Sequence, residues 1–413
     1  MNMKTKRILL FATILVFCFT VGEIAVRIMG EFDRDGNFYF NSKVILPLKI
    51  PVVSAQSKIQ SFKSSSSSTF VIDSVLGWVP RPGSRSEDGL YSYNSQGMRS
   101  TPREYADTPE PGLFRIAVFG DSFAHCDNVP YESCFTALLE EQLNSAGIEC
   151  EVLNFGVGGY GLDQAMLRYH EHGAKFSPQL VILGFQPENL KRNLNIVRLL
   201  YYPRSGIPFT KPRFIMIDGR LALVNVPVLP IDQIVPILHN FENWELHPYE
   251  YFYDSHYYES SIWQHSKLLA LIADRLSPGA KEWYKKRILY KTNDEEQRLG
   301  WEIFAAFAEE VAANGANFLI VHLPAQQDLE VMRQLGNFPY QSFLDALDEK
   351  YDVIHTEQQL LQAVHRTSYA DLYAGHFTPM GNSIIADALS EFITPRIGGY
   401  KGVTRDVSSQ SDE

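Results

Sequence analysis

The sequence Arg115-Ile-Ala-Val-Phe-Gly-Asp-Ser-Phe-Ala-His-Cys126 determines the fold prediction. Ile116 to Phe119 is a short apolar run that stops at Gly120, and a helical pattern follows from about Glu132, which predicts a strand, a sharp turn and a helix. Ser122 lies on the turn. A serine there has an uncrowded hydroxyl at the carboxyl end of a buried strand, and its own amide can point the same way. Ser122 is therefore a candidate nucleophile, although Gly, Asp and Ser are also ordinary turn residues.

Length and charge limit the function classes. The chain has 413 residues, of which 45% are hydrophobic, and a formal net charge of -11. This length suits two to three average domains, or one large domain with insertions, and the composition can fill a sizeable core. A nucleic-acid partner would need a basic face, so no nucleic-acid binding is expected.

The N-terminus has the pattern of a membrane segment. Lys4, Lys6 and Arg7 precede an uncharged apolar run from Ile8 to Gly22. This run is intermediate between a signal-peptide core and a full span, and its end fits a cleavage site poorly. We expect residues 1–30 to be an uncleaved anchor in the inner membrane, and a cleaved signal segment is the alternative. The basic residues place the N-terminus in the cytoplasm and the rest of the chain outside it.

The remaining domain boundaries follow from composition. Residues 31–70 are predicted to be a flexible linker, because Asn41 to Ser68 is weakly patterned and ends in a serine run. Residues 71–395 are expected to form the catalytic domain, and residues 396–413 a polar tail. Leu76 to Pro80 is predicted to pack as a short strand against one edge of the sheet.

Four cysteines do not define a disulfide. Cys18 lies in the apolar segment, which leaves Cys126, Cys134 and Cys150, an odd number for an exported domain. A Cys126–Cys134 bridge and three buried thiols are both compatible with the sequence, so no disulfide is assigned.

Two further strands end in distinctive loops. Cys150 to Asn154 leads into a loop with four glycines, Phe155 to Gly161, which does not have the spacing of a dinucleotide fingerprint. Gln179 to Gly184 leads into Phe185 to Leu190. In an open parallel sheet, loops that follow the strands lie on one rim. A ligand is therefore expected at that rim.

Residues 191–300 interrupt the pattern and are predicted to be an inserted subdomain. Arg213 to Val224 is expected to be a hairpin that turns at Asp218-Gly219. The aromatic residues that follow could stack on sugars or simply form a core. The histidines of this region are too widely spaced for a helical metal pair, so no metal site is predicted; they are His239, His247, His256 and His265.

The sheet is expected to resume with Asn317 to Leu323 and Tyr351 to His355. His376 follows in the stretch Asp371 to Gly381, just before an amphipathic helix. It occupies the position of a general base on the strand rim, or it is an ordinary surface histidine near the start of a helix.

Together these segments resemble the SGNH or GDSL hydrolase family. The matching blocks, in order, are Gly120 to Ser122, Asn154 to Gly159, Gly184 to Asn189 and Asp371 to His376. The resemblance implies a flavodoxin-like three-layer α/β/α domain with a parallel five-stranded sheet. It also implies ester chemistry at a serine, without a cofactor or metal.

The sequence departs from the family pattern in two blocks. The third block usually reads Gly-x-Asn-Asp, so the side-chain oxyanion donor is either Asn189 after a shift or Gln186 in the unshifted register. The last block usually has Asp three residues before His, where this chain has Tyr373, and Asp371 is the nearest carboxylate. A histidine oriented by a backbone carbonyl is the alternative.

The implied mechanism assigns His376 as base, Ser122 as nucleophile and Asp371 as orienter, with the Ser122 and Gly159 amides and the Asn189 side chain as oxyanion donors. We predict an ester hydrolase outside the inner membrane that acts on an acyl ester, and this location suggests an acylated envelope or exported glycan as its substrate. A polysaccharide O-acyltransferase that forms the same acyl-enzyme is one alternative. A catalytically silent binding module is the other.

Overall fold

The computed structural model describes residues 2–65, 67–258, 261–276 and 294–400. The chain divides into two compact units, each built from several segments. Unit 1 comprises Met1–Lys63, Val197–Pro208 and Pro230–Lys291, and unit 2 comprises Ser64–Ile196, Phe209–Leu229 and Thr292–Glu413.

Unit 2 contains a parallel five-stranded sheet. Its spatial order is β12-β11-β8-β6-β7, which is 5-4-3-1-2 in chain order and therefore the flavodoxin-like arrangement. The predicted α/β fold is confirmed, with shifts of one or two residues at the strand ends. The strands are β6 (Phe114–Gly120), β7 (Cys150–Asn154), β8 (Leu180–Phe185), β11 (Asn317–His322) and β12 (Asp352–His355).

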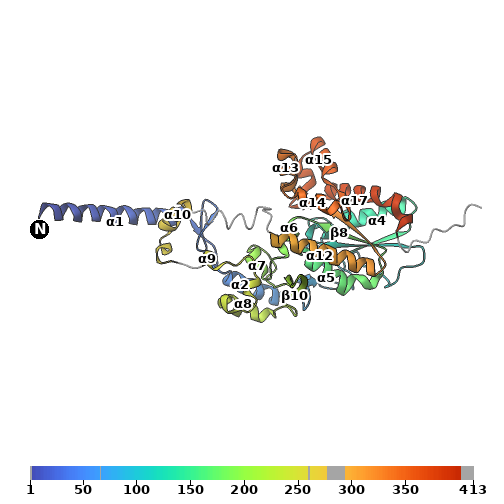
Figure 1. Cartoon of the computed structure of the whole chain (residues 1–413), viewed down its shortest axis with the longest axis horizontal. Helices are drawn as coiled ribbons and strands as arrows, with labels where there is room; N and C mark the ends of the chain where they lie inside the picture. The colour runs from blue at the N-terminus through green and yellow to red at the C-terminus, as the bar shows by residue number, and fades with distance from the viewer. Residues whose placement is uncertain (1, 66, 259–260, 277–293, 401–413) are drawn as a thin grey trace, which may run out of the picture. The chain divides into compact units, whose positions relative to one another are not determined.

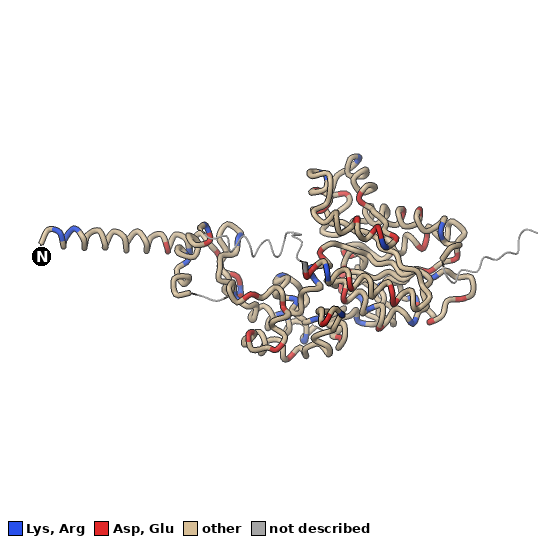
Figure 2. Tube along the Cα trace, in the orientation of Figure 1, with Lys and Arg blue, Asp and Glu red and all other residues tan. Residues whose placement is uncertain are grey.

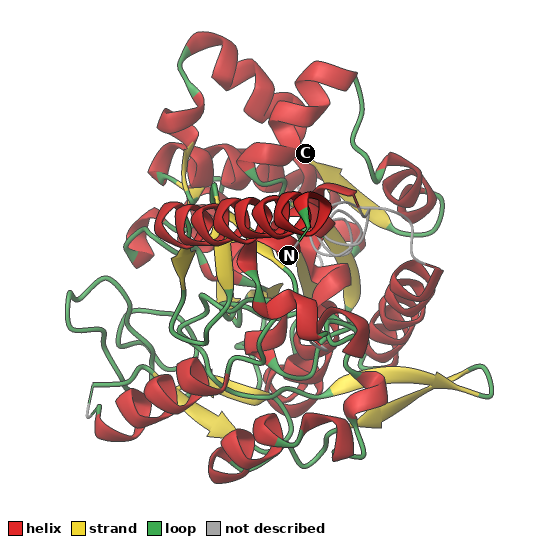
Figure 3. Ribbon diagram, turned by 90° about the vertical axis from the view of Figure 1, so that its left-hand side faces the viewer, coloured by secondary structure: helices red, strands yellow, loops and turns green. Residues whose placement is uncertain are grey.

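Helices cover both faces of this sheet. Figure 1 shows α4 (Phe135–Ser145) and α17 (Pro379–Ile393) on one face, and α5 (Leu162–Arg168) and α12 (Asp294–Ala313) on the other. Every residue of the three strands β6, β7 and β8 is buried, as expected where helices lie on both sides. Figure 3 colours the helices red and the strands yellow. The serine turn thus follows a strand that is paired on both sides.

Shorter helices connect the strands at the carboxyl end of the sheet. A 3-10 turn at Tyr131–Ser133 precedes α4, so that helix begins later than the sequence pattern predicted. The other connecting helices are α3 (Ser122–His125), α6 (Glu188–Arg192), α13 (Gln326–Leu335), α14 (Gln341–Asp348), α15 (Glu357–Arg366) and α16 (Tyr369–Leu372).

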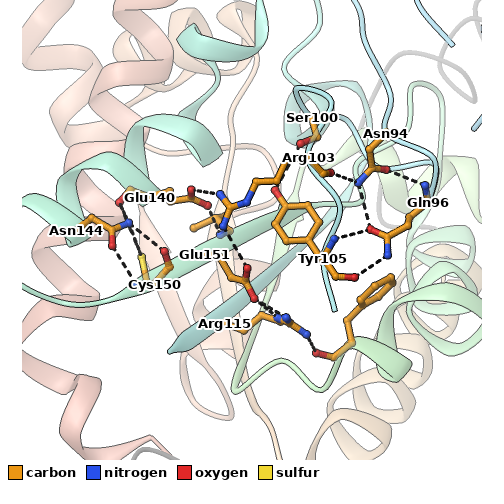
Figure 4. Close-up of polar contacts among 12 residues, drawn as sticks. Asn94, Gln96, Ser100, Arg103, Tyr105, Arg115, Glu140, Asn144, Cys150 and Glu151 are labelled. Carbon is orange, nitrogen blue, oxygen red and sulfur yellow. Dashed lines mark hydrogen bonds and ion pairs between the residues drawn. The ribbon is translucent and has the colours of Figure 1, made fainter. Parts of the chain in front are cut away.

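A buried ion pair holds the segment before the sheet against its edge (Figure 4). Arg115 on β6 is only 1% exposed and pairs with Glu151 on β7 at 2.5 Å. Arg103 also reaches Glu151, at 3.2 Å, and binds Glu140 on α4. Removing one member of a buried pair typically costs about 3–5 kcal/mol. Glu151 therefore links the lead-in segment to the first two strands.

The prediction of a flexible linker over residues 31–70 is wrong. Unit 1 contains a three-stranded antiparallel sheet and a 13-residue helix in this region, with Val44, Leu48 and Ala55 buried. The partners of Val44 and Leu48 include Tyr257, far along the chain, so a local pattern could not reveal them. The elements are β1 (Glu31–Phe32), β2 (Phe38–Phe40), β3 (Lys43–Ile45) and α2 (Val52–Ser64).

The N-terminal helix α1 (Met3–Met29) also belongs to unit 1. It is long and apolar enough to cross a membrane, and Figure 2 shows basic residues only at its start and near its far end. At that far end, Glu23 accepts hydrogen bonds from the Lys267 and Leu268 amides, at 3.0 and 2.8 Å. Glu23 thereby caps α10 (Lys267–Leu276), which joins α1 to the folded part of unit 1.

The region 191–300 is not one inserted subdomain. The predicted hairpin forms as β9 (Arg213–Ile217) and β10 (Arg220–Val224) within unit 2. Most of the remainder belongs to unit 1, where Phe241, Phe252 and Tyr257 are buried and form part of the core. The helices of this remainder are α7 (Arg198–Tyr201), α8 (Ile231–His239) and α9 (Ser255–Tyr258), together with α10.

Candidate active site

Ser122 and His376 meet at the carboxyl end of β6. The Nε2 atom of His376 lies 2.8 Å from the Ser122 hydroxyl, although the two residues are 254 positions apart. Ser122 is the first residue of α3, whose N-cap Asp121 accepts from the Phe123 amide at 2.9 Å. The hydroxyl and imidazole are thus placed for proton transfer, and the predicted pair comes together.

Glycine makes the turn before the serine possible. Gly120 has a φ of 149°, and a Cβ atom there would lie 2.7 Å from the Gly184 carbonyl oxygen. On the other side, His376 follows the turn residue Gly375, whose φ is 84°, between the two-residue strands β13 (Tyr373–Ala374) and β14 (His376–Phe377). Backbone geometry on both sides therefore fixes where the two side chains meet.

The Nδ1 atom of His376 contacts an amide instead of a carboxylate. Asn128 Nδ2 lies 3.3 Å from this atom and donates to the Ala374 carbonyl at 2.7 Å. The predicted orienter Asp371 is engaged elsewhere: its carboxylate accepts from the Ser368 amide at 2.9 Å and from the Ser368 hydroxyl at 2.7 Å. Asp371 therefore caps the short helix α16, and the Ser-x-x-Asp spacing of a capping box was the sequence signal for this role.

A histidine–carboxylate pair, His125 and Asp127, lies near His376. His125 Nδ1 bonds the Asp127 carboxylate, and its Nε2 lies 2.8 Å from the Tyr93 hydroxyl. Burial lowers the pKa of His125. Burial alone would raise the pKa of Asp127, but the His125 contact and the charge of His376 bring it below its usual value. Asp127 is thus a carboxylate near the base, and the sequence analysis missed it.

The glycine loop provides an amide without an internal partner. Gly159 has a φ of 83°, and its N–H makes no hydrogen bond to any residue that the structure describes. Trp78 supports this loop by donating to the Gly158 carbonyl at 3.1 Å, while the Tyr160 hydroxyl donates to the Trp78 carbonyl at 2.5 Å. The sequence predicted only that Leu76 to Pro80 packs on one edge of the sheet. It did not predict these contacts with the glycine loop.

Asn189 lies behind the serine turn, and its amide hydrogens are occupied. Its Nδ2 atom donates to the Asp121 carboxylate at 2.9 Å and to the Tyr160 carbonyl at 3.2 Å. Its Oδ1 atom accepts from the Gln186 amide at 2.9 Å. Arg192 adds an ion pair to Asp121 at 2.7 Å. The expected oxyanion role of Asn189 therefore does not agree with these contacts, which make it a support of the turn.

Gln186 is the other candidate donor. It is 3% exposed, and its Oε1 atom accepts from the Glu188 amide at 2.7 Å. Its Nε2 atom makes no hydrogen bond to any residue of the described ranges. This leaves an amide donor uncommitted on the loop that follows β8.

The three cysteines of unit 2 are buried free thiols. Cys126, Cys134 and Cys150 form no disulfide, so the bridge that the sequence allowed between Cys126 and Cys134 is absent. Burial raises the pKa of Cys150 to about 12, which keeps this thiol protonated and unreactive at neutral pH.

Comparison with solved structures finds similar folds among esterases. Acetylxylan esterase Axe2 from Geobacillus stearothermophilus, in a catalytic mutant form, is 13% identical with a TM-score of 0.36, and the match covers 69% of this chain and 95% of that one. Acetyl xylan esterase AlAXEase is 13% identical with a TM-score of 0.34 and coverage of 68% and 100%. A lipolytic G-D-S-L family member from Veillonella parvula is 14% identical with a TM-score of 0.30 and coverage of 68% and 98%.

All three TM-scores are below 0.5, so these likenesses carry no argument about the chemistry of this chain. No family model matches the sequence, and no curated protein matches it. The chemistry of the site is therefore argued from the contacts of this chain alone.

Proposed function

We propose that the chain is a serine ester hydrolase in which Ser122 is the nucleophile and His376 the general base. The observation that carries this proposal is the 2.8 Å contact between the Ser122 hydroxyl and His376 Nε2. It lies at the rim where open parallel sheets bind ligands. The glycine loop is bonded to the serine turn there, since the Val157 amide donates to the Gly120 carbonyl at 3.1 Å, and the Gly159 amide of this loop has no partner among the described residues. Nucleophile, base and oxyanion donor are the minimum set for acyl transfer.

In the proposed reaction, His376 takes the hydroxyl proton as Ser122 Oγ bonds to the ester carbonyl carbon. The Ser122 and Gly159 amides stabilise the oxyanion that forms, each by about 3 kcal/mol in comparable sites. The intermediate collapses with loss of the alkoxide, which receives the proton from His376. Water then enters by the same steps, releases the acid and regenerates Ser122.

Two neighbours of His376 complete this proposal. Asn128 fixes the ring through Nδ1 but has no charge with which to stabilise the imidazolium. Asp127 is the carboxylate whose charge acts on His376. Its negative charge stabilises the imidazolium of His376 without a direct hydrogen bond, whereas the acid of a catalytic triad does so through such a bond.

We further propose that the catalytic unit acts outside the inner membrane, held by α1 as an uncleaved anchor. The capping contacts of Glu23 support a helix that continues beyond the apolar run, because they hold its last turns against the start of α10. The proposed substrate in this location is an acyl ester on an envelope or exported glycan. That substrate class rests on the proposed location alone.

The test is formation of an acyl-enzyme on the full-length chain in detergent. Incubation with p-nitrophenyl acetate should release nitrophenol and add one acetyl mass, located on Ser122 by peptide mapping. Ser122→Ala and His376→Ala should each abolish turnover. His170→Ala is the matched control, since His170 pairs with Glu310 on the outside of unit 2. Near-normal turnover in folded Ser122→Ala would overturn the proposal.

The same acyl-enzyme could pass its acyl group to a sugar hydroxyl. Adding an oligosaccharide therefore separates the two reactions: hydrolysis releases acetate at an unchanged rate, whereas O-acyl transfer gives an acetylated oligosaccharide. A folded wild-type chain that shows neither acylation nor turnover would favour the silent binding module.

A further inference from the structure

The carboxyl ends of β11 and β12 bring two histidines and a glutamate together. His322 and His355 are paired residues at the ends of these adjacent parallel strands, and Glu357 is the first residue of α15, which follows β12. One ligand atom from each of the three residues lies within 4.8 Å of the other two. None of them takes part in the proposed ester chemistry.

The spacing of these atoms fits a small metal ion. His322 Nδ1 lies 3.1 Å from one oxygen of Glu357, and His355 Nδ1 lies 3.3 Å from the other. For a tetrahedral zinc ion with bonds of about 2.0–2.1 Å, neighbouring ligand atoms are about 3.3 Å apart. Both imidazoles thus present the same ring nitrogen toward one carboxylate, at separations suited to a common ion.

The other nitrogen of each ring is held by a second group. His322 Nε2 lies 3.2 Å from the Tyr340 hydroxyl. His355 Nε2 contacts both oxygens of Asp348, at 2.8 and 2.9 Å. Metal-binding histidines characteristically donate their other N–H to a carboxylate or a similar acceptor, which fixes the ring and its tautomer. The outer contacts of a metal site are therefore present as well as the ligands.

We propose that His322, His355 and Glu357 bind one divalent transition-metal ion, with zinc as the best match. Two imidazoles and one carboxylate are a ligand set that zinc uses, and the fourth position is left to water. Glu357 and Asp348 together neutralise the two positive charges. His322 is fully buried, whereas the side chain of His355 is 28% exposed, so an ion can enter from that side.

The ion has a structural role in this proposal. Its three ligands come from the ends of two strands and the start of a helix, and Asp348 adds the end of α14. One ion therefore joins four elements at the edge of the sheet that is remote from β7. Protons compete for the same nitrogens, since contacts with Glu357 and Asp348 raise the pKa of His355 to about 9. Zinc binding must then release protons.

Zinc itself is the probe. The full-length chain, purified without a histidine tag and dialysed against a chelator, is titrated with ZnCl₂ at pH 7.5 by calorimetry. Bound zinc is counted by mass spectrometry of the metal. We expect one zinc ion per chain and a higher thermal unfolding midpoint. Cobalt(II) in its place should give the visible absorption bands of a tetrahedral or five-coordinate site.

The variants separate ligands from neighbours. His355→Gln and Glu357→Gln should each weaken zinc binding more than a hundredfold. Asp348→Asn, which leaves all three ligands in place, should weaken it by about tenfold to a hundredfold. The control His170→Gln disrupts another histidine–carboxylate pair and should bind zinc as the wild type does.

The proposal is overturned if the wild-type chain binds less than one zinc per chain at micromolar concentration. It is also overturned if folded His355→Gln binds zinc as tightly as the control. Should Glu357→Gln fail to fold, Asp348→Asn decides the matter, because unchanged affinity in that variant contradicts the predicted outer contact.

Discussion

Gly120 and Gly184 are paired residues in the parallel ladder between β6 and β8. Ser122 and Gln186 each follow one of these glycines by two residues, so they leave the sheet at the same level of the rim. Asn189 comes a further three residues along the chain, where its amide is bonded to Asp121. This register favours Gln186 as the third oxyanion donor.

Gln186→Ala should therefore slow acylation of the serine by about a hundredfold, the usual cost of one oxyanion donor, while the thermal midpoint changes little. Asn189→Ala should instead lower the thermal midpoint, because it leaves the Asp121 carboxylate and the Tyr160 carbonyl with fewer donors. Stopped-flow acylation and thermal unfolding of both variants distinguish the two roles. Asn189→Ala that retains full stability but loses acylation would restore Asn189 as the donor.

Asp371→Ala should leave turnover within about twofold of the wild type, since the Asp371 carboxylate caps α16 through Ser368. The expected effect is a loss of about 1 kcal/mol in stability, typical of a helix cap. Steady-state kinetics and chemical denaturation measure the two quantities. A loss of turnover near that of His376→Ala would show that Asp371 reaches the imidazole during catalysis.

Asn128→Asp should raise kcat by about tenfold or more. In the observed orientation, the Asn128 amide donates toward His376 Nδ1 and so favours the tautomer whose Nε2 carries the hydrogen. A carboxylate at this position would favour Nδ1–H and stabilise the imidazolium, the reverse of the loss seen when a triad aspartate becomes asparagine. The left-handed backbone at residue 128, with a φ of 72°, suits Asp as well as Asn. An unchanged or reduced kcat would contradict this account of the Nδ1 contact.

Ionisation of Glu296 should make the chain less stable as the pH rises from about 4.5 to about 7. Burial raises the pKa of Glu296 to about 7, against an ordinary value of 4.5. Between these values the unfolded chain loses the proton first, so the free energy of unfolding falls from pH 4.5 to pH 7 by at most about 3 kcal/mol. Glu296→Gln should remove this dependence and raise the unfolding midpoint at pH 8, with little change at pH 4.5. Equal stabilisation at both pH values would rule out the titration.

Protease added to spheroplasts should digest most of the chain and spare α1. The basic residues Lys4, Lys6 and Arg7 before the apolar run predict an N-terminus in the cytoplasm. Immunoblotting with antibodies to each end of the chain reports the outcome, and a cytoplasmic marker protein controls for lysis. Protection of the catalytic unit would place it inside the cell.

Local sequence signals were sufficient for the strands of the main sheet and for the rim positions of Ser122 and His376. The apolar strand before Gly120 and the position of His376 before an amphipathic helix can be recognised from nearby residues. The apolar strands recognised in this way include β6, β7 and β8, which pair with one another in the sheet. The order of the strands followed from the resemblance of the blocks. These features are encoded within short windows of the chain.

Features that depend on distant partners were missed. Trp78 gave no sign that its indole N–H would bind Gly158, eighty residues later. Leu48 resembled part of a linker because its partner Tyr257 lies on another segment. His322 and His355 were each the last or next-to-last residue of a predicted strand. The sequence did not show that these strands are adjacent and in the register that pairs the two histidines.

The contacts of Trp78 also bear on the order in which the site is completed during synthesis. Trp78 leaves the ribosome before the central strand and well before Gly158 and Tyr160, the groups to which it bonds. The Trp78 indole N–H therefore has no Gly158 carbonyl to bind until the glycine loop has been synthesised. Because His376 is synthesised after all of these residues, the nascent chain contains the complete glycine loop well before it acquires the proposed base.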